Sequence, residues 1–312
     1  MKTHTMPANR SPLCGGTVAL TALLLVLLAP SLRAETLLRW KFQQGQRLHV
    51  TVEQATRLET TAGPKPREMK VDTTMEMDWQ VNAVDDGGTA EMTQTITRLK
   101  MRMETLGAAP VEFDTASEEQ PTGTARYFIA ASRVVGVELK VAMTARGEIT
   151  SVSLSDDAKK LLDEALAGTS LPALFSSEGL TATLKQTATA LPEEAVDLGD
   201  TWETSTSSKL PIGEVRQMTT YTYAGSRDHD GRMLDAIDLK SQLQLSPSPK
   251  DAENAAQIKE QEHTGTLWFD AEAGRFVESN VSQKLVTESP YRGTQVRVSA
   301  TTSQTTTFRA GE

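Results

Sequence analysis

The sequence predicts a mainly β, β-rich α+β fold in which two related, curved antiparallel sheets, each half-barrel-like, are joined by one or two helices. Three observations predict this fold. Residues 71–81 alternate apolar and polar side chains, which is the pattern of a half-buried strand. Residues 215–223 repeat that alternation in the second half of the chain, again ahead of a turn rich in Asp and Gly. A clear helical period is confined to residues 155–168, in the middle of the chain.

Residues 1–34 are expected to be a signal peptide. The apolar run at residues 17–29 is shorter than the roughly 20 residues that span a bilayer, and it has the length of a signal-peptide core. Lys2 and Arg10 precede this run, and the small residue Ala34 follows it, so we expect cleavage near Ala34. The mature protein is therefore expected to be exported, to the periplasm or to the extracellular space.

The charge and cysteine content exclude several classes of partner. Cleavage would remove three of the 32 basic residues and none of the 41 acidic ones, which leaves a net charge of 29 − 41 = −12. A chain this acidic lacks the basic surface that nucleic acid requires. The single cysteine, Cys14, lies in the expected signal peptide, so the mature chain has neither disulfides nor thiolate metal ligands.

A first β module is expected over residues 35–154. The strand at 71–81 turns at an Asp-Asp-Gly-Gly sequence and returns at 90–103, which makes a long hairpin. The apolar positions change phase after Thr97, and this predicts a β-bulge near Thr97 and Arg98 that bends the sheet. The other expected elements of the module are a polar loop at 104–124 and a hairpin of 135–143 with 149–152.

Residues 155–190 are expected to form a helical connector. Ser155 can cap a helix whose first turn carries two aspartates, and the helix is expected to end at Gly168. A second helix is favoured at 177–189. Residues there also alternate, however, so a strand remains open as the alternative.

A second β module, expected over residues 191–312, repeats the design of the first. Its strand at 215–223 turns at Asp-His-Asp-Gly and returns at 237–245. The order of hairpin, polar loop and hairpin matches the first module, which indicates an internal duplication of topology. The remaining expected elements are a polar loop at 246–262 and a hairpin of 267–269 with 276–285.

Two short sequence patterns carry a resemblance to known proteins. The chain opens with L-R-W-K-F-Q-Q-G at 38–45, and the pattern Leu-Pro-x-x-x-Val-x-x-Gly-Asp-x-Trp spans 191–202. Together with the two hairpin modules, they resemble a family of uncharacterised, exported, β-rich bacterial proteins. The resemblance covers most of the mature chain and implies a fold and a compartment, but it implies no activity. The Gly-Asp-Thr-Trp sequence at 199–202 is expected to be a turn that enters a strand, with the tryptophan as a buried anchor.

Methionine and aromatic side chains on the expected strands are the candidate ligand-binding residues. Their bulk either fills an ordinary core or lines a groove for an apolar ligand. Paired methionines could also hold Cu(I), but no cysteine or histidine cluster accompanies them, so a flexible apolar face is favoured and no metal or cofactor is expected. The candidates are Met75, Met77, Trp79, Met101, Met103, Trp202 and Trp268.

The sequence contains no recognisable catalytic motif. His49, His229 and His263 lack metal-site spacing, and the Asp-His-Asp-Gly sequence at 228–231 fits a hairpin turn better than a calcium loop. No nucleophile elbow, phosphate loop or dinucleotide fingerprint occurs. A pair of carboxylates for hydrolysis cannot be recognised from spacing alone.

The leading hypothesis is therefore a non-enzymatic binding or carrier module for an apolar ligand, such as a lipid, or for an envelope component. The alternative is a structural or assembly protein that contacts another protein of the cell envelope. An unidentified hydrolase ranks third.

Overall fold

The computed structural model describes residues 35–63, 66–117, 133–160, 184, 188–210, 213–247, 255–291 and 293–311. These residues belong to a single compact unit, Glu35–Glu312. The expected signal peptide and its cleavage site at Ala34 lie outside the described residues. Within the described part of the chain, no helix has the length and apolar character needed to cross a membrane.

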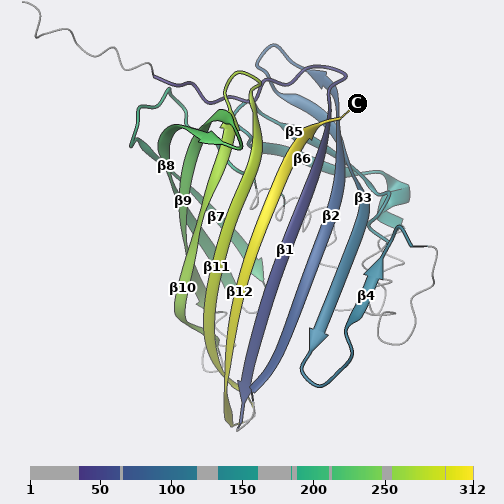
Figure 1. The fold of residues 1–312 in the computed structure, drawn as a ribbon, viewed down its shortest axis with the longest axis vertical. Helices are drawn as coiled ribbons and strands as arrows, with labels where there is room; N and C mark the ends of the chain where they lie inside the picture. Colours follow the sequence, from purple (N-terminus) through teal and green to yellow (C-terminus); the bar gives the residue numbers. More distant parts are fainter. Residues whose placement is uncertain are drawn as a thin grey trace, which may run out of the picture. The chain divides into compact units, whose positions relative to one another are not determined.

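The described chain forms one antiparallel sheet of twelve strands, in the order β6-β5-β3-β2-β1-β12-β11-β10-β9-β8-β7, with β4 paired to β3 (Figure 1). The mainly β, curved-sheet prediction is confirmed. The strands are β1 (Arg47–Ala62), β2 (Pro66–Val84), β3 (Ala90–Thr105), β4 (Val111–Asp114), β5 (Glu138–Met143), β6 (Ile149–Leu154), β7 (Thr201–Leu210), β8 (Gly213–His229), β9 (Arg232–Pro247), β10 (Gln257–Asp270), β11 (Arg275–Tyr291) and β12 (Thr294–Ala310).

The two expected sheets are joined into one. Strand β1 pairs with β12 from Leu48 opposite Ala310 to Ala62 opposite Val296, and β12 also pairs with β11 from Thr307 opposite Glu278 to Thr294 opposite Tyr291. The sequence predicted no strand at residues 294–310, and therefore did not predict the strand that joins the two modules. The edges that two separate sheets would have exposed at β1 and β11 are both satisfied by β12.

The expected hairpins and their irregularities are present. Strands β2 and β3 pair with Glu76 opposite Arg98 and Met77 opposite Ile96, which leaves Thr97 as the extra residue of a bulge where one was expected. Strands β5 and β6, β8 and β9, and β10 and β11 also form the expected hairpins. The β8–β9 turn has positive φ at both central residues, Asp230 and Gly231, as a tight hairpin requires.

Two loops were expected to be longer than they are. The polar segment at 104–124 contains the short strand β4, which pairs with β3 through Phe113 opposite Met101. The segment at 246–262 already belongs to β10 from Gln257 onwards. Both stretches are rich in polar and charged residues, which gave them a loop-like composition.

The helical connector is described only in part. Residues 156–160 are helical, and the Ser155 hydroxyl accepts a hydrogen bond from the Ala158 amide at 3.1 Å, so the expected N-cap is present. Leu184 is also helical. Most of the expected helices at 155–168 and 177–189 lies outside the described residues.

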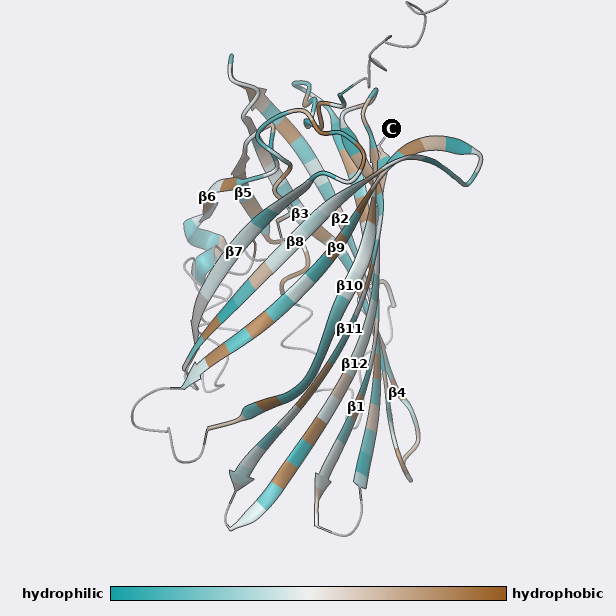
Figure 2. Ribbon diagram, turned by 90° about the vertical axis from the view of Figure 1, so that its left-hand side faces the viewer, coloured by the Kyte–Doolittle hydropathy of each residue, from teal (hydrophilic) through white to brown (hydrophobic). Residues whose placement is uncertain are grey.

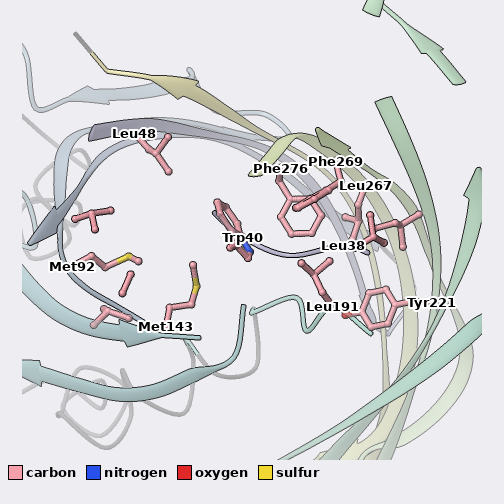
Figure 3. Packing of buried hydrophobic residues seen from close by; sticks show 14 of the residues in the cluster. Leu38, Trp40, Leu48, Met92, Met143, Leu191, Tyr221, Leu267, Phe269 and Phe276 are labelled. Carbon is pink, nitrogen blue, oxygen red and sulfur yellow. The ribbon is translucent and has the colours of Figure 1, made fainter. Parts of the chain in front are cut away.

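The hydrophobic core fills one end of the concave side of the sheet (Figure 3). The residues just before β1 cross this end, where the Trp40 amide donates to Ala145 in the β5–β6 turn and the Lys41 amide donates to Gly274 in the β10–β11 turn. The Trp40 ring is 5% exposed, and its centroid lies 5.6 Å from that of Phe276. This segment therefore ties hairpins from both halves of the chain to one core.

The residues that lead into β7 form the other segment within the core. Leu191 is fully buried, and Thr36 and Val196 exchange two backbone hydrogen bonds of 3.0 Å. Gly199 has a φ of +93°, and the Asp200 carboxylate accepts the amide of Asp197 at 2.8 Å immediately before β7 begins. The expected strand-entry turn is confirmed, and the 191–202 sequence pattern has a structural role.

Candidate functional site

The strands extend well beyond the core, and their register assigns each side chain to one face. Leu48 and Phe308 pack at the core end, and every second residue further along β1 and β12 lies on the same, concave side. We call the half-buried members of this set beyond the core the distal concave face. Its members include Gln54, Thr56 and Leu58; Met69, Val71, Thr73 and Met75; Met101 and Met103; Val296, Val298, Ala300, Thr302 and Gln304; Val281, Gln283, Leu285 and Thr287; and His263.

The two faces of the sheet differ sharply in charge. No member of the distal concave face is Asp, Glu, Lys or Arg; on that side, exposed Arg67 lies near the end of β2. The outer face carries ion pairs, such as Arg57 with Glu68 at 3.0 Å and Arg297 with Glu288 at 2.8 Å. Figure 2 shows the resulting alternation of hydrophilic and hydrophobic bands along the strands. An ionised group is costly to bury, so a bound molecule could cover the distal concave face without the free-energy cost of desolvating a charge.

The polar groups of the distal concave face are uncharged, and several of them bond to one another. The hydroxyls of Thr56 and Thr302 lie 3.2 Å apart across β1 and β12, and the Gln54 amide donates to Thr56 at 3.1 Å. Hydroxyl hydrogens rotate to suit a new partner, so these groups can also bond a polar atom of a ligand.

His263 is the titratable member of this face. Burial lowers the pKa of its imidazole below the ordinary value, so the ring is neutral at pH 7. Its Nδ1 atom is buried and has no hydrogen-bond partner among the described residues. Two residues further along β10, Gly265 has no side chain, so the concave surface is recessed there. A Cβ at this position would lie only 2.5 Å from the Asn280 carbonyl oxygen.

The candidate methionines lie on the concave side, in two zones. Met75, Met101 and Met103 belong to the distal concave face, where Met101 lies opposite Thr73 on β2. Met77 and Trp79 lie closer to the core. The Trp79 ring packs 5.8 Å from that of Phe308, so it acts as part of the core wall.

The two other candidate tryptophans lie on different faces. Trp202 on β7 stacks on Tyr221 at 5.4 Å, and its indole N–H donates to the Ala190 carbonyl at 2.8 Å, so it anchors the segment before β7. Trp268 lies on the outer face, between the buried, inward-facing Leu267 and Phe269, and is therefore separated from the other candidates by the sheet.

Sequence reasoning did not identify the polar members of the distal concave face. Val298, Thr302 and Gln304 on β12 mix apolar and polar side chains on one face, so the strand lacks the apolar–polar alternation that reveals β2. A usable signal was the absence of charge at every second position, together with the high β-propensity of threonine.

A separate pocket of about 610 Å³ lies beside the segment that leads into β7. Arg146, Glu193, Asp200, Glu203 and Trp202 contribute to its wall. The Arg146 guanidinium donates to Glu193 at 3.1 Å there. This charged wall suits water or a polar molecule better than an apolar ligand.

Comparison with known proteins identifies a family without a known activity. No curated protein matches the chain. A solved structure of lipovitellin, described by its lipid–protein interactions, is similar over 87% of this chain with 9% identity and a TM-score of 0.47; the chain spans 26% of that protein's length. A putative exported protein with a YmcC-like fold from Bacteroides fragilis is similar over 88% of this chain and 99% of its own, with 9% identity and a TM-score of 0.26.

The family match covers more than half of the chain. The model of a family of unknown function, DUF6263, matches residues 87–267, which include the 191–202 pattern and exclude the opening at 38–45. The expectation of an uncharacterised family is thus confirmed at this level. The chain belongs to DUF6263, a family of unknown function.

Proposed function

We propose that the protein is an exported, non-enzymatic binding module whose distal concave face holds an apolar ligand with a few uncharged polar groups, such as a neutral lipid. The carrying observation is that this long, half-buried face has no carboxylate, ammonium or guanidinium group. Export is inferred from the apolar run at residues 17–29.

The chemistry of the face supports this ligand class. Valine, leucine and methionine side chains offer apolar contact, and methionine adapts to ligands of different shape. Threonine and glutamine side chains, with the neutral ring of His263, offer hydrogen bonds without a charge to desolvate. An ionised headgroup would find no opposite charge there, so neutral lipids should bind better than anionic ones of the same chain length.

A pair of neighbouring threonines provides a matched test. Thr302 belongs to the distal concave face, whereas Thr301 is exposed on the outer face opposite Arg57 and Lys284. A Thr302→Glu substitution would place a carboxylate under the ligand. The same change at Thr301 would place it beside two cations, so it serves as the control.

The experiment titrates the mature chain and both variants with the uncharged fluorophore N-phenyl-1-naphthylamine, after circular dichroism has shown that each is folded. We expect the wild type and Thr301→Glu to bind alike. Thr302→Glu should bind at least about tenfold more weakly, because covering an unpaired carboxylate costs more than about 1.4 kcal/mol. Equal binding by all three folded proteins would overturn the assignment of the face.

The alternative function, an assembly component of the cell envelope, is distinguished by the same experiment. It is favoured if the folded wild type binds no apolar probe or lipid and crosslinking in an exporting host recovers one stable protein complex.

A further inference from the structure

The outer face carries a cluster of metal-binding side chains that the proposed function does not use. His229 ends β8, Asp230 follows it in the hairpin turn, and Glu278 lies on β11. One ligand atom from each of the three lies within 4.8 Å of the others. Glu278 is far from the other two in sequence, so spacing alone gave no indication of this cluster.

The fold brings the hairpin end of β8 and β9 over Trp268. The register of these strands shifts between Tyr223 and Gly225, where Gly225 has a φ of +82°, and such a bulge bends a strand. The His229 ring then stacks on Trp268 with the ring centroids 4.2 Å apart. This contact fixes the orientation of the imidazole.

In the part of the chain that the structure describes, the imidazole of His229 has a free nitrogen, and the carboxylate of Glu278 is oriented by a neighbouring side chain. The Nε2 atom of His229 is buried and makes no hydrogen bond within the described residues, although Oε1 of Glu278 lies 3.5 Å away. The side-chain amide of Asn280 donates to Glu278, and its own oxygen accepts a hydrogen bond from Thr305 at 2.8 Å. Such supporting hydrogen bonds orient the ligands of many metal sites.

One cation beside the cluster, Arg232, is already paired with a carboxylate. Arg232 lies opposite His229 in the β8–β9 ladder, and its guanidinium is bonded to the Asp270 carboxylate at 2.6 Å. Asp230 has a φ of +53°, and its carboxylate is exposed, so it can rotate towards a bound ion.

We propose that His229, Asp230 and Glu278 bind a divalent transition-metal ion of the zinc and copper class. One imidazole nitrogen and two carboxylate oxygens suit Zn²⁺ and Cu²⁺, whereas Ca²⁺ and Mg²⁺ prefer oxygen ligands alone. Metal–ligand bonds of about 2.0–2.2 Å require the three donor atoms to approach one another more closely, which rotation of the two carboxylates allows. Three protein ligands leave a coordination position for water or a second molecule.

Trp268 provides the readout for this site. The tag-free mature protein is titrated with Cu²⁺, which quenches the fluorescence of a nearby indole, and Zn²⁺ binding is measured separately by calorimetry. We expect saturable quenching at one equivalent of Cu²⁺, reversed by excess Zn²⁺. A Trp268→Phe variant should lose this quenching while still binding one Zn²⁺.

Three variants identify the ligands, and a fourth is the control. His229→Ala and Glu278→Gln should each weaken Zn²⁺ binding at least about tenfold, and Asn280→Ala should weaken it by about tenfold. His49→Ala, which removes a different histidine–carboxylate pair on the outer face, should bind Zn²⁺ as the wild type does. The proposal is overturned if folded wild type binds no Zn²⁺ at one equivalent, or if folded His229→Ala and Glu278→Gln both bind it unchanged.

Discussion

Replacement of Trp40 by alanine should remove a core contact that the two halves of the chain share, while the pairing of β1 with β12 remains. The Trp40 ring is 5% exposed and lies against Phe42 at 5.1 Å, Phe276 at 5.6 Å and Phe308 at 6.1 Å. Truncation of a buried tryptophan to alanine costs about 3–5 kcal/mol, a total that includes the lost packing against neighbouring rings. We expect a loss of about 4 kcal/mol in the free energy of unfolding.

Urea denaturation followed by far-ultraviolet circular dichroism measures this loss. With an m-value of about 3 kcal/mol/M, the midpoint should fall by roughly 1.3 M urea. Leu106→Ala is the control, because Leu106 is 80% exposed and its truncation should change stability by no more than about 0.5 kcal/mol. A loss below about 1.5 kcal/mol for Trp40→Ala, with an unchanged m-value, would refute the idea that this ring ties the core together.

Three further substitutions test other contacts. Tyr223→Phe should cost about 2 kcal/mol at pH 7, because the hydroxyl donates to the buried Asp235 carboxylate at 2.7 Å. Burial raises the pKa of Tyr223 to about 12, so the stability that the hydroxyl contributes is present below pH 10 and is lost as the pH rises from about 10 to 12. Melting curves of the wild type and Tyr223→Phe across this pH range would show the loss. Hydrogen bonds from Arg98 lower the pKa of Asp114 to about 2. The wild type should therefore be more stable than Asp114→Asn above about pH 4. In an acid titration, this difference in stability should vanish as the pH falls towards 2. Gly265→Ala should lower the urea midpoint by an amount equivalent to about 1–3 kcal/mol, because its Cβ would lie 2.5 Å from a carbonyl oxygen of β11; an unchanged midpoint would show that the strands can separate there.

The sequence predicted the elements whose periodicity is local. The alternation at 71–81 and the change of phase at Thr97 correctly placed β2, β3 and their bulge, because a strand with one face in the core must alternate. Strand β12 was missed, because its concave side mixes Val298 with Thr302 and Gln304. Its place in the sheet depends on pairing with β1, a partner far away in the chain, which no local pattern reveals.

The candidate site was predicted only in part, for the same reason. The methionines at 75, 101 and 103 were assigned correctly to strands, but the polar members of the distal concave face come mainly from β1, β11 and β12. Trp268 was grouped with them because a tryptophan in a strand has no sign of which face it occupies until the register is known. Its neighbours Leu267 and Phe269 point into the core, which leaves Trp268 outside.

Native mass spectrometry of the mature protein, purified from an exporting host, tests the central claim most directly. The account predicts a reproducible mass above that of the polypeptide, which is released on denaturation and identified by extraction as an uncharged apolar molecule. It also predicts that the Thr302→Glu variant carries less of this mass than Thr301→Glu. A bare polypeptide mass for folded wild type that stays unchanged after incubation with neutral lipids would contradict the claim that the distal concave face is a binding surface.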